Sequence, residues 1–371
     1  GDWYDEAAMN KRVSEFLGTG AFSSVTLDTD EVGEDQIDLT MDMREARAKE
    51  VSLSAGFGSY EGAINRATYT DRNLWGQMLS FSSGFELSSR GVLGESKVVN
   101  PWLFGSDYSM TSRIYALIYG HEGYTSFDSG LDAKFSRKFG DHYLMELLLG
   151  YSIVNITAEG LEKSELGETV YTHPRIAFTQ TLDYRDNPVL PKTGWHLKLP
   201  LQVGAVVGDM STTYFKGGLA GGWYHPLGKT YQLGLGGSVN FIIPSGDSEE
   251  LPIDLRLFNG GARSVRSFPE RELGPTSADG NYPLGGEASW VMNAEVSRPV
   301  AGPLRAVAFV DAGTLAREFS ELTSSDIEIA VGLGLRMDLP IGPVRLEYGY
   351  NMTRDDDEPT GALHFAIGVA F

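Results

Sequence analysis

The chain lacks several features that would assign it to a common class of protein. It contains no cysteine, which excludes disulfides and thiolate metal sites. No run approaches the roughly 18 apolar residues of a membrane helix, so the chain could span a membrane only as a closed barrel of strands. Basic residues are few, with 30 Lys and Arg against 50 Asp and Glu and a formal net charge of −20. This balance argues against nucleic acid as a partner, because nucleic-acid-binding proteins concentrate Lys and Arg on one surface.

Signals for catalysis and for cofactors are missing as well. The six histidines are dispersed along the chain, and none has the HExxH spacing of a zinc site. The G-x-S-x-G motif of a nucleophilic serine does not occur. From the sequence we therefore expect no enzyme active site, no metal and no cofactor.

Residues 1–47, the N-terminal module, differ from the rest of the chain and predict one helix and two strands. The helix can begin at Asp5 and end at Gly18, and alternating residues predict strands over 22–27 and 37–43. The apolar residues of the helix recur at the three-and-four spacing of one buried face, and they are Ala8, Met9, Val13, Phe16 and Leu17. Such a module is too small to be more than part of a domain. Because the chain also begins without Met or a signal peptide, we expect an excised fragment or a mature end.

From Lys49 onward, apolar residues alternate with small or polar ones, which predicts strands with an outward apolar face. The segment 327–339 shows this clearly, because its odd positions are apolar and its even positions include Glu328, Arg336 and Asp338. A charge that faced lipid at the membrane midplane would cost roughly 2–4 kcal/mol. We therefore expect the even positions to face a lumen, and we interpret Arg336 as a residue that lines it.

The number of such segments predicts a mainly β chain with an antiparallel transmembrane barrel over residues 48–371. We count about 16 strands, an even number, as single-chain bacterial barrels require. The strands are expected to begin near Val51, Ala63, Gln77, Gly91, Tyr108, Phe127, His142, Tyr171, Gly194, Thr213, Tyr231, Ala288, Leu304, Ile327, Val344 and Ala362.

The connections between the segments differ in length. Outer-membrane barrels have short turns on the periplasmic side and long loops outside. The N-terminal module precedes the first strand on the short-turn side, so we expect it in the periplasm. Tight turns are predicted at 139–141, 226–229, 299–303 and 340–343, and long polar loops at 156–170, 244–287, 314–326 and 352–361.

Many aromatic residues lie near the predicted strand ends. Aromatic side chains at such positions are typical of the girdles that flank the apolar band of a membrane barrel. The residues interpreted in this way are Tyr60, Tyr69, Trp75, Trp102, Tyr119, Tyr124, Tyr171, Trp195, Trp223, Tyr224, Tyr231 and Trp290.

The segment 259–286, hereafter the inserted loop, is too long, too rich in Gly and Pro and too charged to be a strand. Connections longer than about 12–15 residues without regular structure are usually functional or disordered. Within the loop, Arg266 stands between two apolar residues, Val265 and Phe268. We interpret the loop as a plug inside the barrel. Arg266 would then need a carboxylate partner, because a stranded member of a buried ion pair costs about 3–5 kcal/mol.

Several motifs together resemble the BamA/TamA superfamily of outer-membrane assembly and secretion barrels. The motif Val265, Arg266, Ser267 and Phe268, between glycine pairs on both sides, is similar to the inserted loop of that family. The other similar segments are residues 183–195, 309–313, 332–336 and 340–343. The family usually has Gly where this chain has Ser267, so we expect Ser267 to occupy, at some cost, a backbone position that prefers φ > 0.

The resemblance implies a partner for Arg266 and partners for the protein. Asp311 is the expected acceptor, with Glu295 and Asp338 as alternatives. The N-terminal module is similar to the last part of a POTRA domain, which implies a periplasmic location below a bacterial outer-membrane barrel. The family inserts or translocates unfolded outer-membrane or secreted proteins without nucleotide. The implied partners are these clients, the lipid bilayer, lipopolysaccharide, and periplasmic chaperones or accessory subunits that bind the POTRA domain.

The first and last predicted strands carry small residues on their inner faces and therefore have little to lock their seam. An unpaired strand edge is a template on which a client strand can add. We expect a lateral gate at this seam, formed by Val51, Leu53, Ala55, Phe57, Leu363, Phe365, Ile367, Val369 and Phe371.

Other functions stay open from the sequence. A two-partner secretion pore would pass a soluble client through the lumen and would depend on movement of the inserted loop. A passive porin would conduct ions and would need no POTRA-like module. The barrel could also be a membrane anchor for an upstream enzymatic domain. The residues do not distinguish a BamA-like protein from a TamA-like one or from a secretion transporter.

Overall fold

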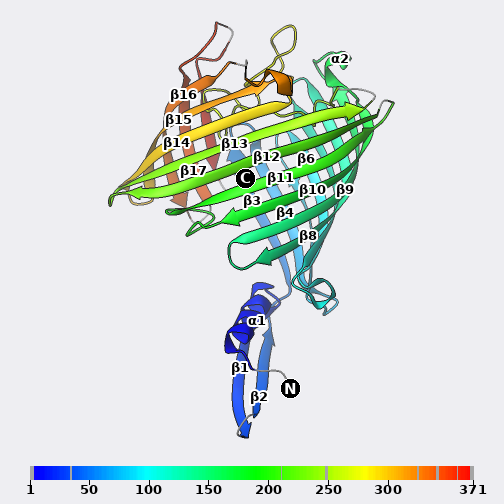
Figure 1. The fold of residues 1–371 in the computed structure, drawn as a ribbon, viewed down its shortest axis with the longest axis vertical. Coiled ribbons are helices and arrows are strands. Elements are labelled where there is room, and N and C mark those ends of the chain that lie inside the picture. The colour runs from blue at the N-terminus through cyan, green and yellow to red at the C-terminus, as the bar shows by residue number, and fades with distance from the viewer. Residues whose placement is uncertain are drawn as a thin grey trace.

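A computed structural model describes residues 4–33, 36–209, 211–246, 250–323, 326–339, 342–356 and 358–367. The chain forms two parts (Figure 1): a helix with a two-stranded sheet, and a closed barrel of sixteen antiparallel strands. The predicted mainly β architecture with a transmembrane-type barrel is confirmed in strand number and in closure. The end of the barrel next to the N-terminal module is called the lower rim below, and the opposite end the upper rim.

The N-terminal module contains helix α1 (Glu6–Gly18) and the hairpin of β1 (Phe22–Gly33) and β2 (Gln36–Glu45). Asp5 caps the helix by accepting a hydrogen bond from the backbone N of Ala8 at 3.1 Å. The expectation of one buried helix face is wrong, since no described residue of α1 is buried. The apolar face is half-exposed because only the small hairpin and one turn of the barrel lie against it.

The barrel strands pair in chain order, and β18 returns to β3 to close the cylinder. Turns rich in Gly, Pro and Asp separate the strands at the positions predicted from the sequence. The observed strands therefore begin within a few residues of the predicted ones. The strands are β3 (Lys49–Gly58), β4 (Gly62–Leu74), β5 (Leu79–Leu87), β6 (Gly91–Asn100), β7 (Ser109–His121), β8 (Tyr124–Phe139), β9 (Tyr143–Ala158), β10 (Val170–Asp183), β11 (Gly194–Val207), β12 (Ser211–Leu227), β13 (Tyr231–Gly246), β14 (Ala288–Ala301), β15 (Leu304–Ala316), β16 (Glu328–Leu339), β17 (Gly342–Asn351) and β18 (Gly361–Ile367).

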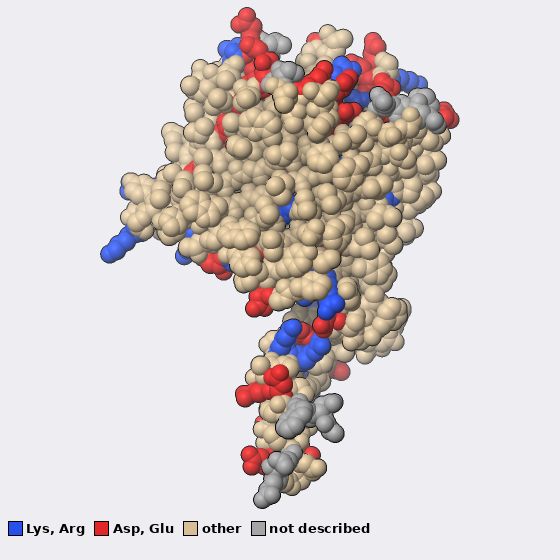
Figure 2. Space-filling view, in the orientation of Figure 1, with Lys and Arg blue, Asp and Glu red and all other residues tan. Residues whose placement is uncertain are grey.

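The two faces of the barrel wall differ as the alternation predicts. On β16, Leu333 points outward with 70% of its surface exposed, whereas on the neighbouring strands Asp311 and Glu347 point inward and are almost fully buried. Figure 2 shows an outer wall that is largely free of charge, with acidic and basic residues gathered at the upper rim, at the lower rim and on the N-terminal module. Such a band is the surface that a bilayer covers.

Helices in the described ranges are short: α1, α2 (Lys163–Leu166), and the 3₁₀ turns η1 (Leu103–Gly105) and η2 (Phe319–Glu321). None of them is long and apolar enough to cross a membrane.

The lengths of the connections follow the predicted asymmetry only in part. Long connections leave β9, β13, β15 and β17 at the upper rim, as expected. The upper connections 59–61, 88–90 and 122–123 are nevertheless very short, and the lower connection 184–193 is long. The upper rim is therefore low above β3–β8 and high above the remaining strands.

Four aromatic residues assigned to the girdles point into the barrel instead. Tyr124 and Tyr171 are buried in an apolar cluster of the lumen, and Tyr60 and Tyr119 line a cavity there. The reason is that the upper lumen is filled by the inserted loop, so an aromatic side chain near a strand end can pack inward. Other members of the girdle set do lie on the outer face, among them Tyr69, Trp195, Trp223 and Tyr231.

The outward position of Leu333 generates a stability prediction. We expect Leu333→Arg to lower the free energy of unfolding of the barrel in lipid vesicles by roughly 2–4 kcal/mol, because the charge would face lipid. Leu39→Arg, on the hairpin of the N-terminal module, is the matched control and should change it little. Denaturant titration of the reconstituted barrel measures both, and equal effects of the two substitutions would contradict the assignment of the outer wall.

Candidate functional site

The inserted loop and the residues just before it fill the upper half of the lumen. Ile253 and Leu284 pack with Tyr171 and its neighbours on β8–β11, while Leu257, Val265 and Phe268 join a second buried cluster. Val265 and Phe268, which the sequence marked as apolar residues on either side of Arg266, are both buried. Apolar burial of this extent is a strong driving force for docking, so the loop forms a core inside the barrel.

Arg266 lies at the centre of this core and contacts Asp311 on β15. Its Nε lies 2.8 Å from Oδ2 and its Nη2 lies 2.6 Å from Oδ1, so the pair is bidentate. The backbone N of Arg266 also donates to Oδ2 of Asp311 at 3.1 Å. The guanidinium lies flat over the ring of Phe309, 3.4 Å from its centroid. Bidentate geometry and charge-assisted bonds make this one of the stronger polar contacts a protein can form.

Further charged residues extend the pair into a cluster on β14–β17. Nη1 of Arg266 lies 3.2 Å from Glu347 and 3.6 Å from Glu295. Arg336 bridges the same two carboxylates, at 2.5 Å to Glu347 and 2.8 Å to Glu295. Two guanidinium groups thus share three carboxylates, which compensates for the burial of Arg266, Asp311 and Glu347.

The cluster brings together most of the residues that the sequence singled out. Asp311 and Glu295 both reach Arg266, and Arg336 faces the lumen as interpreted. The side chain of Asp338, the other alternative, lies outside the described residues. Glu347 also contacts Arg266, and it was not among the partners expected from the sequence. The alternation along the predicted strand that begins near Val344 could have placed Glu347 on the inner face. In the structure, Glu347 is paired with Gly334, two residues before Arg336 on β16.

Glycines on the neighbouring strands allow the loop to come this close to the wall. A side chain at Gly349 on β17 would overlap the backbone of Arg266, and one at Gly332 on β16 would overlap the ring of Phe309. Gly332 belongs to the segment 332–336 that carried part of the family resemblance. The structure gives these two glycines a steric role, because any Cβ would push the loop or its supporting ring away.

The expected backbone strain at Ser267 is wrong. Among the described residues, the non-glycine residues with positive φ are Trp75, Met78, Phe104 and Arg271, so Ser267 has an ordinary backbone conformation. Ser267 is fully buried, and its hydroxyl has no hydrogen-bond partner in the described structure. Ser267 therefore costs stability because its buried hydroxyl lacks a hydrogen bond, and not because its backbone is strained.

A second contact holds the loop against the opposite wall. Arg271 has a φ of 72°, and its Nη2 donates to the hydroxyl of Tyr124 on β8 at 2.9 Å. Its guanidinium also lies over the ring of Phe258 at 3.4 Å. The inserted loop is thus tied on one side to β14–β17 through Arg266 and on the other side to β8 through Arg271.

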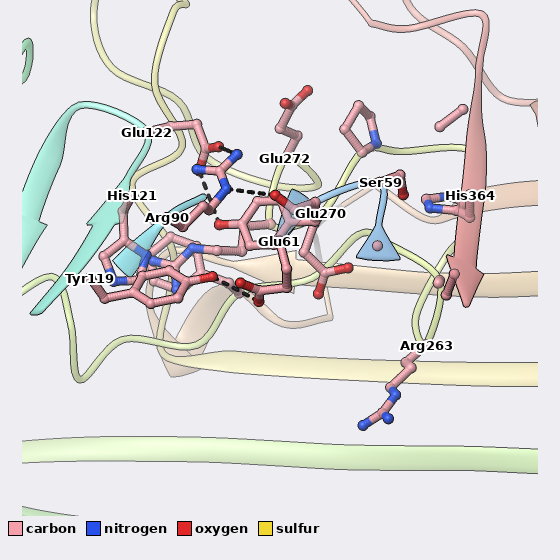
Figure 3. Close-up of a pocket in the computed structure, with 18 of the residues that line it drawn as sticks. Ser59, Glu61, Arg90, Tyr119, His121, Glu122, Arg263, Glu270, Glu272 and His364 are labelled. Carbon is pink, nitrogen blue, oxygen red and sulfur yellow. Dashed lines mark hydrogen bonds and ion pairs between the residues drawn. The ribbon is translucent and has the colours of Figure 1, made fainter. Parts of the chain in front are cut away.

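A cavity of about 980 Å³ lies between the inserted loop and the wall that contains the seam (Figure 3). Arg90 pairs with Glu122 at 2.6 Å, and the hydroxyl of Tyr119 donates to Glu61 at 2.8 Å. Across the cavity, burial raises the pKa of the Glu270 carboxyl above its ordinary value. The lining therefore carries both signs of charge, unlike the two apolar clusters that pack the loop into the lumen.

Strand β18 forms one side of this cavity with its small inner face, made by Ala362, His364 and Ala366. Nε2 of His364 lies 3.1 Å from the backbone O of Arg266, so the last strand contacts the centre of the inserted loop. No sequence argument pointed to His364, because the contact joins residues from distant parts of the chain. Within the described residues, this hydrogen bond joins β18 to the inserted loop.

Within the described residues, the seam between β18 and β3 consists of two residue pairs. Gly58 is paired with Ala366 and Phe57 with Ile367, and the backbone N of Ser59 donates to the O of Phe365 at 2.8 Å. The rings of Phe57 and Phe365 lie 6.0 Å apart on the outer side. Of the remaining gate residues, Val51, Leu53 and Ala55 have no partner on the described part of β18, Leu363 pairs with β17, and Val369 and Phe371 lie outside the described residues.

No group of three or more His, Asp or Glu residues within the described ranges is arranged to hold a metal ion. The described site thus consists of a closed wall, a loop tied into the lumen, and a cavity with charged residues between the loop and the seam.

Comparison with known proteins assigns this arrangement to a family. The Omp85 superfamily domain matches residues 73–371. The chain belongs to the Omp85 superfamily. The whole chain is 23% identical over 386 residues to the outer-membrane protein assembly factor BamA of Nitratidesulfovibrio vulgaris, and 99% of it is 20% identical to BamA of Neisseria meningitidis serogroup B. These alignments cover 48% and 53% of the two BamA proteins, so the chain spans about half their length.

Solved structures of other Omp85-type barrels share the fold. BamA from Haemophilus ducreyi, in a form lacking POTRA domains 1-3, matches 99% of the chain with a TM-score of 0.83 at 17% identity, over 79% of that structure. CdiB from Acinetobacter baumannii matches 96% of the chain with a TM-score of 0.59 at 13% identity, over 67% of that structure. The Omp85 assignment therefore makes this chain an outer-membrane β-barrel protein, related to assembly and secretion barrels.

The buried Arg266 cluster generates a stability prediction. Asp311→Ala removes both oxygens of the bidentate contact, and we expect a loss of about 3 kcal/mol, at the lower end of the range for breaking a buried pair, because Glu347 and Glu295 still face Arg266. The temperature at which the folded barrel changes its mobility on a semi-native gel should fall clearly. Asp141→Ala, in an exposed turn of the lower rim, is the control. An unchanged transition temperature for Asp311→Ala would show that the cluster does not hold the loop.

Proposed function

We propose that this barrel inserts or translocates unfolded outer-membrane proteins through a lateral gate between β3 and β18, without nucleotide. The observation that carries the proposal is the described part of the seam: of residues 361–367 of β18, Ala366 and Ile367 pair with β3, whereas all seven pair with β17 on the other side. A net contribution of about 0.5–1.5 kcal/mol for each hydrogen bond makes so short a ladder easy to open.

The edge of β3 that faces the seam supports this proposal. Residues 49–56 pair with β4 on one side and have no partner on the described part of β18 on the other. An exposed strand edge offers unpaired N–H and C=O groups, and an incoming strand can satisfy them by β-augmentation. A client strand that added to β3 would enter the membrane already hydrogen-bonded, which removes the cost of unsatisfied backbone groups in lipid.

The cavity behind β18 gives the gate room to move. The inner face of β18 contacts the cavity and not a packed core, so its displacement breaks few apolar contacts. His364 is the exception, because its bond to the backbone O of Arg266 ties β18 to the inserted loop. We propose that this bond keeps the gate closed at rest, while the Arg266 cluster keeps the loop and β14–β17 in place during opening.

The N-terminal module fits the role of the last part of a POTRA domain on the periplasmic side. Arg12 pairs with Asp107 at 3.2 Å, and Phe16 packs against Trp102 with ring centroids 5.4 Å apart. Both contacts lie on the lower connection of β6 and β7. A module held at this place can pass clients toward the seam and can bind periplasmic chaperones or accessory subunits. Lipopolysaccharide would face the upper half of the outer wall.

A two-partner secretion pore is the second candidate function. The structural match to CdiB and the charged residues in the cavity beside the inserted loop favour it, because a soluble client needs polar groups along its path through the lumen. This function would require the Arg266 cluster to break so that the loop could leave the lumen. The lateral gate requires the opposite, namely that the loop stays docked while the seam opens.

A disulfide across the seam tests the gate. Gly58→Cys with Ala366→Cys places the thiols on directly paired residues, and the chain has no cysteine of its own. In the full-length protein, oxidation should stop the assembly of a client barrel in proteoliposomes, and reductant should restore it.

The control is Ser83→Cys with Ser96→Cys, which joins β5 and β6 where the two hydroxyls already lie 2.8 Å apart. This crosslink away from the seam should leave assembly unchanged. If the seam crosslink forms and client assembly continues at the same rate, the lateral gate is wrong. Loss of soluble-client secretion only when the inserted loop is crosslinked to the wall would favour the secretion pore.

A further inference from the structure

The side of the inserted loop that faces away from the Arg266 cluster is held less firmly than the cluster side. Its residues 269–272 lie across the cavity from the upper connection 59–61 (Figure 3). There Arg271 contacts a tyrosine hydroxyl and a phenylalanine ring, which carry no charge. Its φ is 72°, in the left-handed region, and its buried Nε has no hydrogen-bond partner in the described structure. Both features cost free energy, so this side of the loop gains less from docking.

Two carboxylates meet on this side of the cavity, Glu270 of the inserted loop and Glu61 of the connection 59–61. Figure 3 shows their side chains next to each other, with Arg263 directed away from both. Oε1 of Glu61 accepts a hydrogen bond from the hydroxyl of Tyr119 at 2.8 Å, and no donor among the described residues contacts its Oε2. The carboxylate of Glu270 accepts from a backbone N–H of its own loop. The pair therefore has one free oxygen at which a proton could be shared.

The charged neighbours do not neutralise this pair. Arg90 is engaged elsewhere, because it is paired with Glu122 at 2.6 Å. Arg263 and Arg271 favour the charged form of Glu270, but they do not outweigh the effect of its burial. The titratable and charged groups that face the pair from the loop and from the wall are Tyr60, Arg90, Tyr119, His121, Glu122, Arg263, Arg271 and Glu272.

The carboxyl group of Glu270 holds its proton more tightly here than in water. Its burial in the first place, and then the charge of Glu61, raise the pKa of Glu270 above its ordinary value. Two facing carboxylates repel each other when both are charged, whereas one shared proton turns the repulsion into a hydrogen bond. Because the docked loop binds this proton more tightly than an undocked loop would, docking is strongest below the ordinary glutamate pKa of about 4.3 and weakens as the pH rises through the raised value.

We propose that Glu61 and Glu270 form a latch that shares one proton and makes the docking of the inserted loop sensitive to pH. In mild acid the carboxyl group of Glu270 donates a hydrogen bond to Oε2 of Glu61 and holds residues 269–272 against the wall. When this proton leaves to water in the cavity, the two charges repel and this side of the loop moves away. The Arg266 cluster stays intact, because its carboxylates face two guanidinium groups. The loop would turn about that cluster, and the cavity would change its width with pH.

The latch would act on a space that both candidate functions use. Strand β18 moves into this cavity when the gate opens, and a secreted client would pass beside the loop there. Neither Glu61 nor Glu270 belongs to the seam or to the Arg266 cluster. A failure of the latch would therefore leave the lateral gate standing, and a failure of the gate would leave the latch standing.

A nitroxide label on the loop tests the latch, because the chain has no cysteine of its own. Glu272→Cys is labelled in the full chain in lipid nanodiscs, since Glu272 is exposed and lies two residues from Glu270. The mobility of the label is recorded by electron paramagnetic resonance from about pH 5 to about pH 8, a range above the ordinary pKa of a glutamate. A label at Ala278→Cys, also exposed on the inserted loop but away from the pair, is the matched control.

We expect the label at residue 272 to be several-fold less mobile at the acid end of the range, and the label at residue 278 to be unchanged. Glu270→Gln supplies an amide that can donate to Glu61 at every pH, so the label at residue 272 should stay immobile throughout. Glu270→Ala has no donor, so the label should stay mobile throughout.

A second titrating group lies nearby and needs its own variant. Burial raises the pKa of Asp254, in the segment before the inserted loop, to about 6. We expect Asp254→Asn to leave the pH dependence of the label at residue 272 in place. Mobility that does not change with pH in the parent chain would overturn the proposal. A pH dependence that survives Glu270→Gln would also overturn it and would assign the titration to Asp254 or His121.

Discussion

The structure depends on the contact between Arg266 and the carboxylate of Asp311 inside the barrel. A sixteen-stranded barrel has a lumen too wide for its own side chains to fill, so something must occupy it or water will. Here the inserted loop occupies the upper half, and Arg266 carries a charge into a place where it is almost fully buried. Asp311, Glu347 and Glu295 compensate for that burial, while Phe309 covers the flat face of the guanidinium.

The same cluster divides the barrel wall into a firm part and a weak part. Strands β14–β17 each supply a residue that contacts the cluster or packs against it, so docking of the loop also stabilises their pairing. The described part of the last strand is joined to the loop by the His364 bond and to β3 by two residue pairs. The contacts that stabilise the wall thus gather on β14–β17, next to the seam, and few are found at the described part of the seam. A gate needs this difference in local stability.

Much of this fold could be predicted from the sequence, because a half-buried strand reveals itself by a period of two and a turn by its Gly, Pro and Asp residues. Strands predicted at Gly194, Tyr231, Ala288 and Leu304 begin at those residues. Inward parity placed Arg336 in the lumen, and Asp311 and Glu295 were among the expected partners of Arg266. Contacts across the lumen could not be predicted in the same way, so Glu347 and His364 were not assigned to Arg266.

Tyr124 and Tyr171 were placed on the outer girdle because periodicity near a strand end does not show that a loop fills the lumen. The prediction of backbone strain at Ser267 was wrong. It was inferred from the glycine that the family usually has at this position, and no feature of this sequence itself indicated a positive φ there.

Hydrogen–deuterium exchange of the barrel in lipid nanodiscs tests most directly whether stability is distributed in this way. Amides of β18 and of the first half of β3 should exchange much faster than those of β15, which contacts the Arg266 cluster and pairs along its length on both sides. If β18 and β3 were as protected as β15, the seam would be as firm as the rest of the wall, and the division between a braced wall and a weak seam would be wrong.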